Sequence, residues 1–159
     1  MTLDIATSAS LSIKKQLSVD APIERAFRVF TANMGMWWPK DHHIGKSPLK
    51  DCVVEPHAGG RWYEITEDGG TCEWGKVLAY DPPRRLLLAW QLNAAFEFDA
   101  KLVTEVEVRV SALGPARTQV DFEHRNIERF GETAPKLRDM LDEGWGGILE
   151  SFARTARVE

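Results

Sequence analysis

The chain has 159 residues, of which 43% are hydrophobic and 28% charged, and its formal net charge is −4 at pH 7. This length fits one domain with a substantial core, and the negative charge without a basic patch argues against a nucleic acid partner. No stretch approaches the roughly 20 apolar residues that span a bilayer, so we expect no membrane span and a cytoplasmic location. We expect residues 1–10 to be a flexible N-terminal segment and residues 11–157 to form a single domain.

The first expected elements are a strand and a short helix. Apolar residues alternate over residues 11–19, except at Lys15, which we place near a strand end or at the mouth of a cavity. The sequence Asp20-Ala21-Pro22 predicts a helix start with Asp20 as its cap, and the helix ends near Ala32. The buried stripe of this helix is expected to contain Ile23, Ala26, Phe27 and Phe30.

The segment from Trp37 to His43 is dense in aromatic and titratable side chains: Trp37, Trp38, Asp41, His42 and His43. Such side chains combine an apolar body with a polar tip, which suits the mouth of a cavity. The alternative is that one tryptophan belongs to the core and the other covers the surface.

Six further strands are expected, separated by turn residues. Glu67 to Gly70, Pro82-Pro83 and Gly114-Pro115 each favour a chain reversal. Alternating valines and charged residues near Thr104 to Val110 predict a sheet with one covered and one solvated face. The strands are expected near residues 50–55, 60–67, 71–80, 85–92, 103–112 and 117–125, with Trp74, Leu78 and Tyr80 on one face before the prolines and Leu86, Leu88 and Trp90 after them.

Two polar residues are expected on the same strand face as an apolar neighbour two positions earlier. If Trp62 points inward, Glu64 does too, and its carboxylate then needs a partner, because an unpaired buried charge is costly. In the opposite register Glu64 lies in water. His124 continues the face of Phe122 and lies either in the core with a hydrogen bond or in a pocket wall.

The possible metal ligands do not have the spacing of a metal site. His42 and His43 are adjacent, and successive side chains diverge on an extended chain. Cys52 and Cys72 lie on different expected strands and form no close pair, so we expect reduced thiols. No phosphate loop or dinucleotide fingerprint is present, and we expect neither a metal nor a cofactor.

A long C-terminal helix is expected to cover the sheet. Thr133 is its candidate cap and Pro135 suits its first turn. Three glycines at 144, 146 and 147 each cost about 1 kcal/mol in a helix interior, which points either to close packing, the reading we favour, or to room for a ligand. The apolar face recurs at steps of three and four in Leu137, Met140, Leu141, Trp145, Ile148, Leu149 and Phe152.

An ordered set of motifs resembles a known family: Gly59-Gly60-Arg61-Trp62-Tyr63-Glu64, Trp74-Gly75-Lys76-Val77, Asp81-Pro82-Pro83-Arg84-Arg85-Leu86, Glu123-His124-Arg125 and Gly144-Trp145. The set resembles the bacterial proteins similar to the C-terminal domain of the activator of Hsp90 ATPase. These belong to the START-like superfamily, also called SRPBCC or Bet v 1-like, and the similarity runs from about Leu11 to about Ala156. The resemblance implies an α+β helix-grip fold, in which a curved antiparallel sheet wraps around the C-terminal helix with a cavity between them. It also favours the mouth position for the Trp37 to His43 segment.

Three functions follow from these features. The first, which we favour, is binding of a small hydrophobic or aromatic ligand in the cavity. The second is a cavity enzyme of the cyclase or hydrolase type, with Glu64 and His124 as an acid/base pair. The third is a protein partner, for which the resemblance implies an Hsp90-type chaperone, and a homodimer also stays open. The candidate ligand-binding residues are Trp37, Trp38, His43, Trp62, Glu64, Trp74, Trp90, Phe122, His124, Met140, Trp145 and Ile148.

Overall fold

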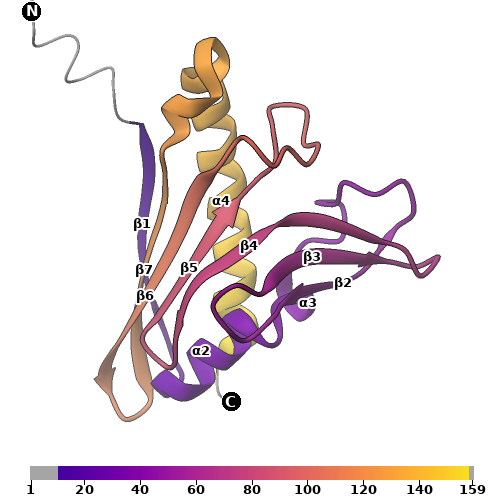
Figure 1. The fold of residues 1–159 in the computed structure, drawn as a ribbon. Coiled ribbons are helices and arrows are strands. Elements are labelled where there is room, and N and C mark those ends of the chain that lie inside the picture. The colour runs from indigo at the N-terminus through magenta and orange to yellow at the C-terminus, as the bar shows by residue number, and fades with distance from the viewer. Residues whose placement is uncertain (1–10, 158–159) are drawn as a thin grey trace, which may run out of the picture.

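The computed structural model describes residues 11–157, in which one seven-stranded antiparallel sheet curls around a long C-terminal helix (Figure 1). The strand order is β1-β7-β6-β5-β4-β3-β2, and the expected α+β helix-grip fold is confirmed. The expectation for residues 1–10 falls outside the described residues. The elements are β1 (Ser12–Val19), α2 (Ile23–Thr31), α3 (Met34–Trp37), β2 (Leu49–Val54), β3 (Arg61–Thr66), β4 (Thr71–Asp81), β5 (Arg85–Trp90), β6 (Thr104–Gly114), β7 (Arg117–Arg125), η1 (Ile127–Thr133) and α4 (Ala134–Ala156).

Two β-bulges bend strand β4. On the β3 side the extra residue is Trp74, and on the β5 side it is Leu78. A bulge adds one residue to one strand and increases the local twist. It also breaks the alternation of faces, so the expectation that Leu78 shares the inner face with Trp74 and Tyr80 is wrong: Leu78 is 42% exposed.

The outer face of the sheet carries an ion-pair network on β6. The β6 valines are buried and the charged residues between them face outward, as expected. Glu107 is nevertheless only 6% exposed, because Arg85 and Arg125 cover it with hydrogen bonds of 2.6 and 2.7 Å. Burial raises the pKa of Glu107, but the hydrogen bonds from Arg125 and Arg85 outweigh it and lower that pKa to about 2.

The helix starts differ from expectation in their caps. The N-cap residue of α2 is Pro22, so Asp20 does not cap this helix. Thr133 occupies the N-cap of α4 with a proline in the first turn, as expected, but its hydroxyl donates to the carbonyl of Phe130 instead of capping. The short helices α3 and η1 had no periodic signal in the sequence. Within the described residues, no helix has both the length and the hydropathy needed to cross a membrane.

Polar contacts fix α4 against its neighbours at two places. Lys15 stays on the inner face of β1, where its ammonium lies 2.5 Å from the Asp142 carboxylate of α4. At the C-terminal end of α4, the Arg25 guanidinium of α2 donates to the carbonyl of Ala156 at 2.7 Å. Lys15 therefore ties a strand to the helix and does not lie at the mouth of the cavity described below.

Gly75 allows β4 and β5 to approach closely. A methyl group at this position would overlap the carbonyl oxygen of Ala89. We therefore expect Gly75→Ala to lower the free energy of unfolding by about 1–3 kcal/mol in urea denaturation. Gly114→Ala, at the end of β6, is the matched control, because a methyl group there meets no atom of the described part of the chain within 4 Å. Equal stability of the two variants would contradict the close approach.

Candidate functional site

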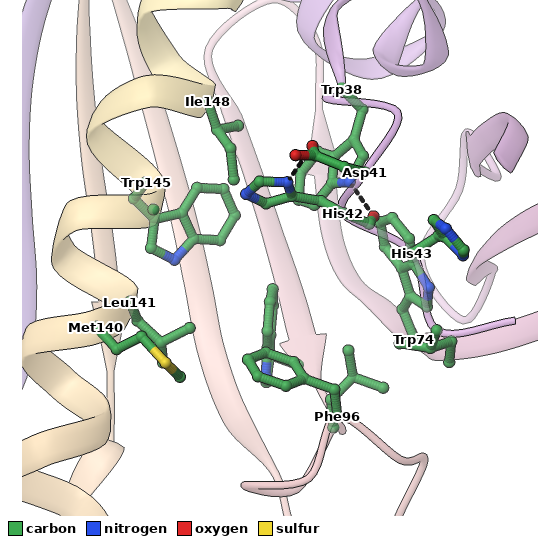
Figure 2. A pocket seen from close by; sticks show the side chains of 14 residues that line it. Trp38, Asp41, His42, His43, Trp74, Phe96, Met140, Leu141, Trp145 and Ile148 are labelled. Carbon is green, nitrogen blue, oxygen red and sulfur yellow. Dashed lines mark hydrogen bonds and ion pairs between the residues drawn. The ribbon is translucent and has the colours of Figure 1, made fainter. Parts of the chain in front are cut away.

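A cavity of about 340 Å³ opens between α4, the sheet and the loop that follows α3 (Figure 2). Its volume lies in the usual range of small-molecule sites, about 300–1,000 Å³. Four separate segments of the chain each contribute an indole to it. The lining residues are Trp38, Asp41, His42, His43, Ile44, Trp74, Trp90, Leu92, Phe96, Met140, Leu141, Gly144, Trp145 and Ile148.

The indole rings form one continuous cluster. The ring centroid of Trp38 lies 4.9 Å from that of Trp74 and 5.7 Å from that of Trp145, and Trp90 also lies 5.7 Å from Trp145. Trp62 is fully buried between two of them, 5.4 Å from Trp74 and 5.8 Å from Trp90. Tilted and edge contacts of this kind contribute about 0.5–1.5 kcal/mol each beyond area burial. The aromatic wall of the cavity is therefore held in place by its own packing.

Glu64 points inward and is fully buried, which answers the question of strand register. Its Oε1 accepts hydrogen bonds from the backbone N–H of Ile44 at 2.7 Å and from the indole N–H of Trp74 at 2.8 Å. Its Oε2 accepts the backbone N–H of Gly45 at 3.0 Å, and a side chain at Gly45 would come within 2.7 Å of Thr66. The carboxylate thus fixes the loop against β3 and β4, and it does not line the cavity.

The loop after α3 places two histidines at the cavity mouth. The imidazole Nδ1 of His42 donates to Oδ1 of Asp41 at 2.8 Å, and Nδ1 of His43 donates to the carbonyl of Gly45 at 2.8 Å. The hydrogen bond from His42 lowers the pKa of Asp41. Figure 2 shows the His42 ring reaching toward Trp145, whereas the His43 ring turns to the other side of the loop.

His124 is a core histidine and does not line the cavity. Its Nδ1 accepts the indole N–H of Trp145 at 3.1 Å, so its Nε2 carries the proton and donates to the Thr104 hydroxyl at 2.8 Å. That hydroxyl donates in turn to the carbonyl of Trp90 at 3.3 Å. Burial lowers the pKa of His124 from its usual 6.5 to about 3, so the ring is neutral. This chain of hydrogen bonds joins α4 to the strands behind the cavity.

The glycines of α4 do not serve close packing, so the favoured interpretation is wrong. Among residues 11–157, a methyl group at Gly144 or Gly147 would meet nothing within 4 Å, and one at Gly146 would meet only the Lys15 amine at 3.9 Å. Gly144 lines the cavity, whereas Gly147 is exposed. Gly144 therefore leaves room in the cavity, and nothing in the structure explains Gly147.

Seven of the twelve predicted binding residues line the cavity: Trp38, His43, Trp74, Trp90, Met140, Trp145 and Ile148. The other five are buried but do not line it: Trp37, Trp62, Glu64, Phe122 and His124. Trp37 packs in the core, with its ring centroid 5.0 Å from Phe30 and 5.3 Å from Phe152.

Sequence reasoning missed several lining residues. The adjacency of a carboxylate and an imidazole in Asp41 and His42 was a usable signal, and the open alternative for the helix glycines already contained Gly144. Phe96 gave no signal, since it lies in an irregular loop with φ of 59°. Ile44, Leu92 and Leu141 complete the set.

The other side chains of the kinds that bind metal ions do not gather in one place. Cys52 and Cys72 are free thiols that flank Glu64 on neighbouring strands, and burial raises the pKa of both. Within residues 11–157, no group of three or more His, Cys, Asp or Glu side chains gathers that could hold a metal ion. The titratable groups that line the cavity are Asp41, His42 and His43.

Several known proteins are similar to this chain in sequence and fold. The family model described as "Activator of Hsp90 ATPase homolog 1-like protein" matches residues 20–157. CalC, a self-sacrificing resistance protein from Micromonospora echinospora, is 33% identical with a TM-score of 0.68, over 91% of this chain and 93% of its own. Txn09, an anthrahydroquino-γ-pyrone synthase solved as a complex, is 33% identical with a TM-score of 0.65, over 90% of this chain and 95% of its own.

A more distant structure shares the fold alone. The Aha1 dimer from Colwellia psychrerythraea is 16% identical with a TM-score of 0.63, over 93% of this chain and 97% of its own. No curated protein sequence matches the chain.

Buried His124 makes stability depend on pH. Its pKa is about 3 in the folded protein and about 6.5 in the unfolded chain, so unfolding takes up a proton in acid. This contribution to stability is complete above pH 6.5 and is lost as the pH falls toward 3. Between pH 7 and pH 5 we expect wild type to lose about 2 kcal/mol more unfolding free energy than His124→Gln, which cannot titrate. Equal losses in urea unfolding would contradict a neutral buried His124.

Proposed function

We propose that this chain, which belongs to the family of activator of Hsp90 ATPase homolog 1-like proteins, binds a flat aromatic small molecule in the cavity between α4 and the sheet. The observation that carries the proposal is the wall, where the indoles of Trp38, Trp74, Trp90 and Trp145 border one open space of about 340 Å³. Mostly apolar cavities with a few polar groups are the usual sites of small ligands.

Apolar surface that is exposed to water at the cavity supports a ligand with aromatic rings. The four indoles already contact one another in tilted and edge arrangements, and a flat ring would extend the same cluster. Phe96 and Met140 line the cavity but are 38% and 50% exposed. A ligand that covers both side chains would remove this surface from water, a gain of about 25 cal/mol per Å².

Polar groups at the mouth support a ligand that carries hydroxyl or carbonyl oxygens. His42 uses its Nδ1 in a hydrogen bond to Asp41, and no described residue pairs with its Nε2. The name of the 33% identical Txn09 describes a synthase of an anthrahydroquino-γ-pyrone, which is a fused ring system with oxygen substituents. We therefore infer a polycyclic phenol or quinone as the ligand class.

Two other functions have less support. A chaperone partner rests on the description of the family, and a homodimer rests on the Aha1 dimer at 16% identity. An enzyme that uses Glu64 and His124 as its acid/base pair would need both residues at the cavity, yet each is fully buried and hydrogen-bonded within the protein. Ligand binding is the function that uses the cavity as it stands.

The proposal is tested by titration with 1,8-dihydroxyanthraquinone, a flat phenolic quinone, followed by tryptophan fluorescence. We expect saturable quenching at one ligand per chain and a rise in melting temperature with ligand concentration. Gly144→Ala places a methyl group in the cavity, so we expect it to weaken binding by about fivefold or more, which corresponds to about 1 kcal/mol.

Gly147→Ala is the matched control, because it makes the same change in the same helix at an exposed position. Both variants are expected to raise stability by up to about 1 kcal/mol, since alanine favours a helix over glycine. Loss of binding in Gly144→Ala alone therefore cannot arise from unfolding. Equal affinity in the two variants, or no saturable quenching of wild type, would contradict the proposal.

A further inference from the structure

The Asp41 and His42 pair at the cavity mouth has the geometry of a proton-transfer site, which ligand binding alone does not require. We propose that His42 is a general base toward an aromatic compound bound in the cavity, and that Asp41 is its positioning residue. This inference rests on the proposed ligand binding and adds an activity to it. The substrate class is a flat aromatic compound with an acidic C–H or O–H bond at the end that faces the mouth.

His42 lies on a loop that is fixed on both sides of it. Its backbone N–H donates to the carbonyl of Pro39 at 3.0 Å, and its carbonyl accepts the indole N–H of Trp38 at 2.8 Å. Trp38 is itself packed into the indole cluster at 5% exposure. On the other side, two backbone N–H groups of the loop donate to the buried Glu64. The imidazole is thus placed before a ligand arrives, which is what efficient proton transfer needs.

The hydrogen bond to Asp41 sets the tautomer of His42. A carboxylate only accepts, so Nδ1 carries the proton at 2.8 Å from Oδ1, and Nε2 keeps its lone pair. Among the described residues, none pairs with this Nε2. Figure 2 shows the ring extending from Asp41 toward Trp145 and Ile148 on α4. When Nε2 takes up a proton, the carboxylate stabilises the positive charge that forms on the ring.

The partial exposure of the pair allows the proton to leave again. The side chain of His42 is 44% exposed and that of Asp41 is 86% exposed. A ligand in the cavity would cover the Nε2 side of the ring, while the Asp41 side stays in contact with water. The ring faces apolar walls on one side, and among the described residues the titratable groups at the cavity besides His42 are Asp41 and His43.

The elimination reaction of 5-nitrobenzisoxazole tests this activity directly. Nε2 of His42 removes the proton from C3 of the probe. The C–H electron pair forms the third bond of a nitrile, the N–O bond breaks, and its electron pair stays on oxygen as a phenolate. No other reactant is needed, His42 then returns its proton to water, and the product 2-cyano-4-nitrophenolate is followed by its visible absorbance.

We expect saturable turnover by wild type, and we expect His42→Gln to lower kcat by about a hundredfold or more, the lower end of the range for a general base. Asp41→Asn is expected to lower kcat as well, because a carboxamide neither fixes the tautomer nor stabilises the imidazolium. Asp41→Glu should restore part of the rate. We expect KM to change less than kcat in all three variants, since the indole wall is unchanged.

The 3-methyl derivative of the probe has no proton at C3 and measures binding alone. His57→Gln, in the exposed β2–β3 turn outside the cavity, is expected to keep the wild-type rate. If the 3-methyl compound binds but His42→Gln turns over the probe as fast as wild type, His42 is not the base and ligand binding stands. A rate lost only in His43→Gln would likewise exclude His42 as the base. If neither the 3-methyl compound nor 1,8-dihydroxyanthraquinone binds, the ligand-binding proposal fails and this inference fails with it.

Discussion

The carboxylate of Glu64 is the contact on which the arrangement of the site depends. It is fully buried and accepts three neutral N–H donors, one from the Trp74 indole on the sheet and two from the loop at Ile44 and Gly45. A buried carboxylate that lost its donors would cost several kcal/mol, so the loop is bound to the sheet by a group that cannot be left unpaired. The residues just before this anchor, from Trp38 to His43, then form the wall and mouth of the cavity.

The bulge in β4 is what brings the Trp74 indole to that carboxylate. Gly75 pairs with Trp62 on one side and with Trp90 on the other, and because both partners point inward the register assigns position 75 to the inner face. In an unbulged strand Trp74 would point to the outer face. The extra residue turns its indole inward, where it packs on Trp38 and donates to Glu64. One local irregularity therefore supplies both part of the aromatic wall and the anchor of the mouth loop.

The sequence predicted the order of the strands, α2 and α4, and most inward faces, because these depend on local periodicity and turn residues. It located Trp90 and Trp145 for the same reason, since each lies on a regular strand or helix face. It failed where the outcome depends on pairing across strands, as at Leu78, whose exposure follows from a bulge. It also selected His43 and left out His42, although both line the cavity, because alternation applies to strands and these two lie in a loop. Phe96 belongs to another irregular loop and had no periodic signal at all.

Burial alone does not identify the polar groups that take part in chemistry. Glu64 and His124 stand out in the sequence because they occupy inward positions, yet the hydrogen bonds of each are used within the protein. Proton exchange with a ligand at either residue would leave a buried partner unpaired, a cost that works against catalysis. His42 is less buried, lies at the cavity, and has no partner for its Nε2 among the described residues. Because its loop contributes no strand pairing, substitutions at Asp41 and His42 can change reactivity there while the indole cluster and the Glu64 anchor stay intact.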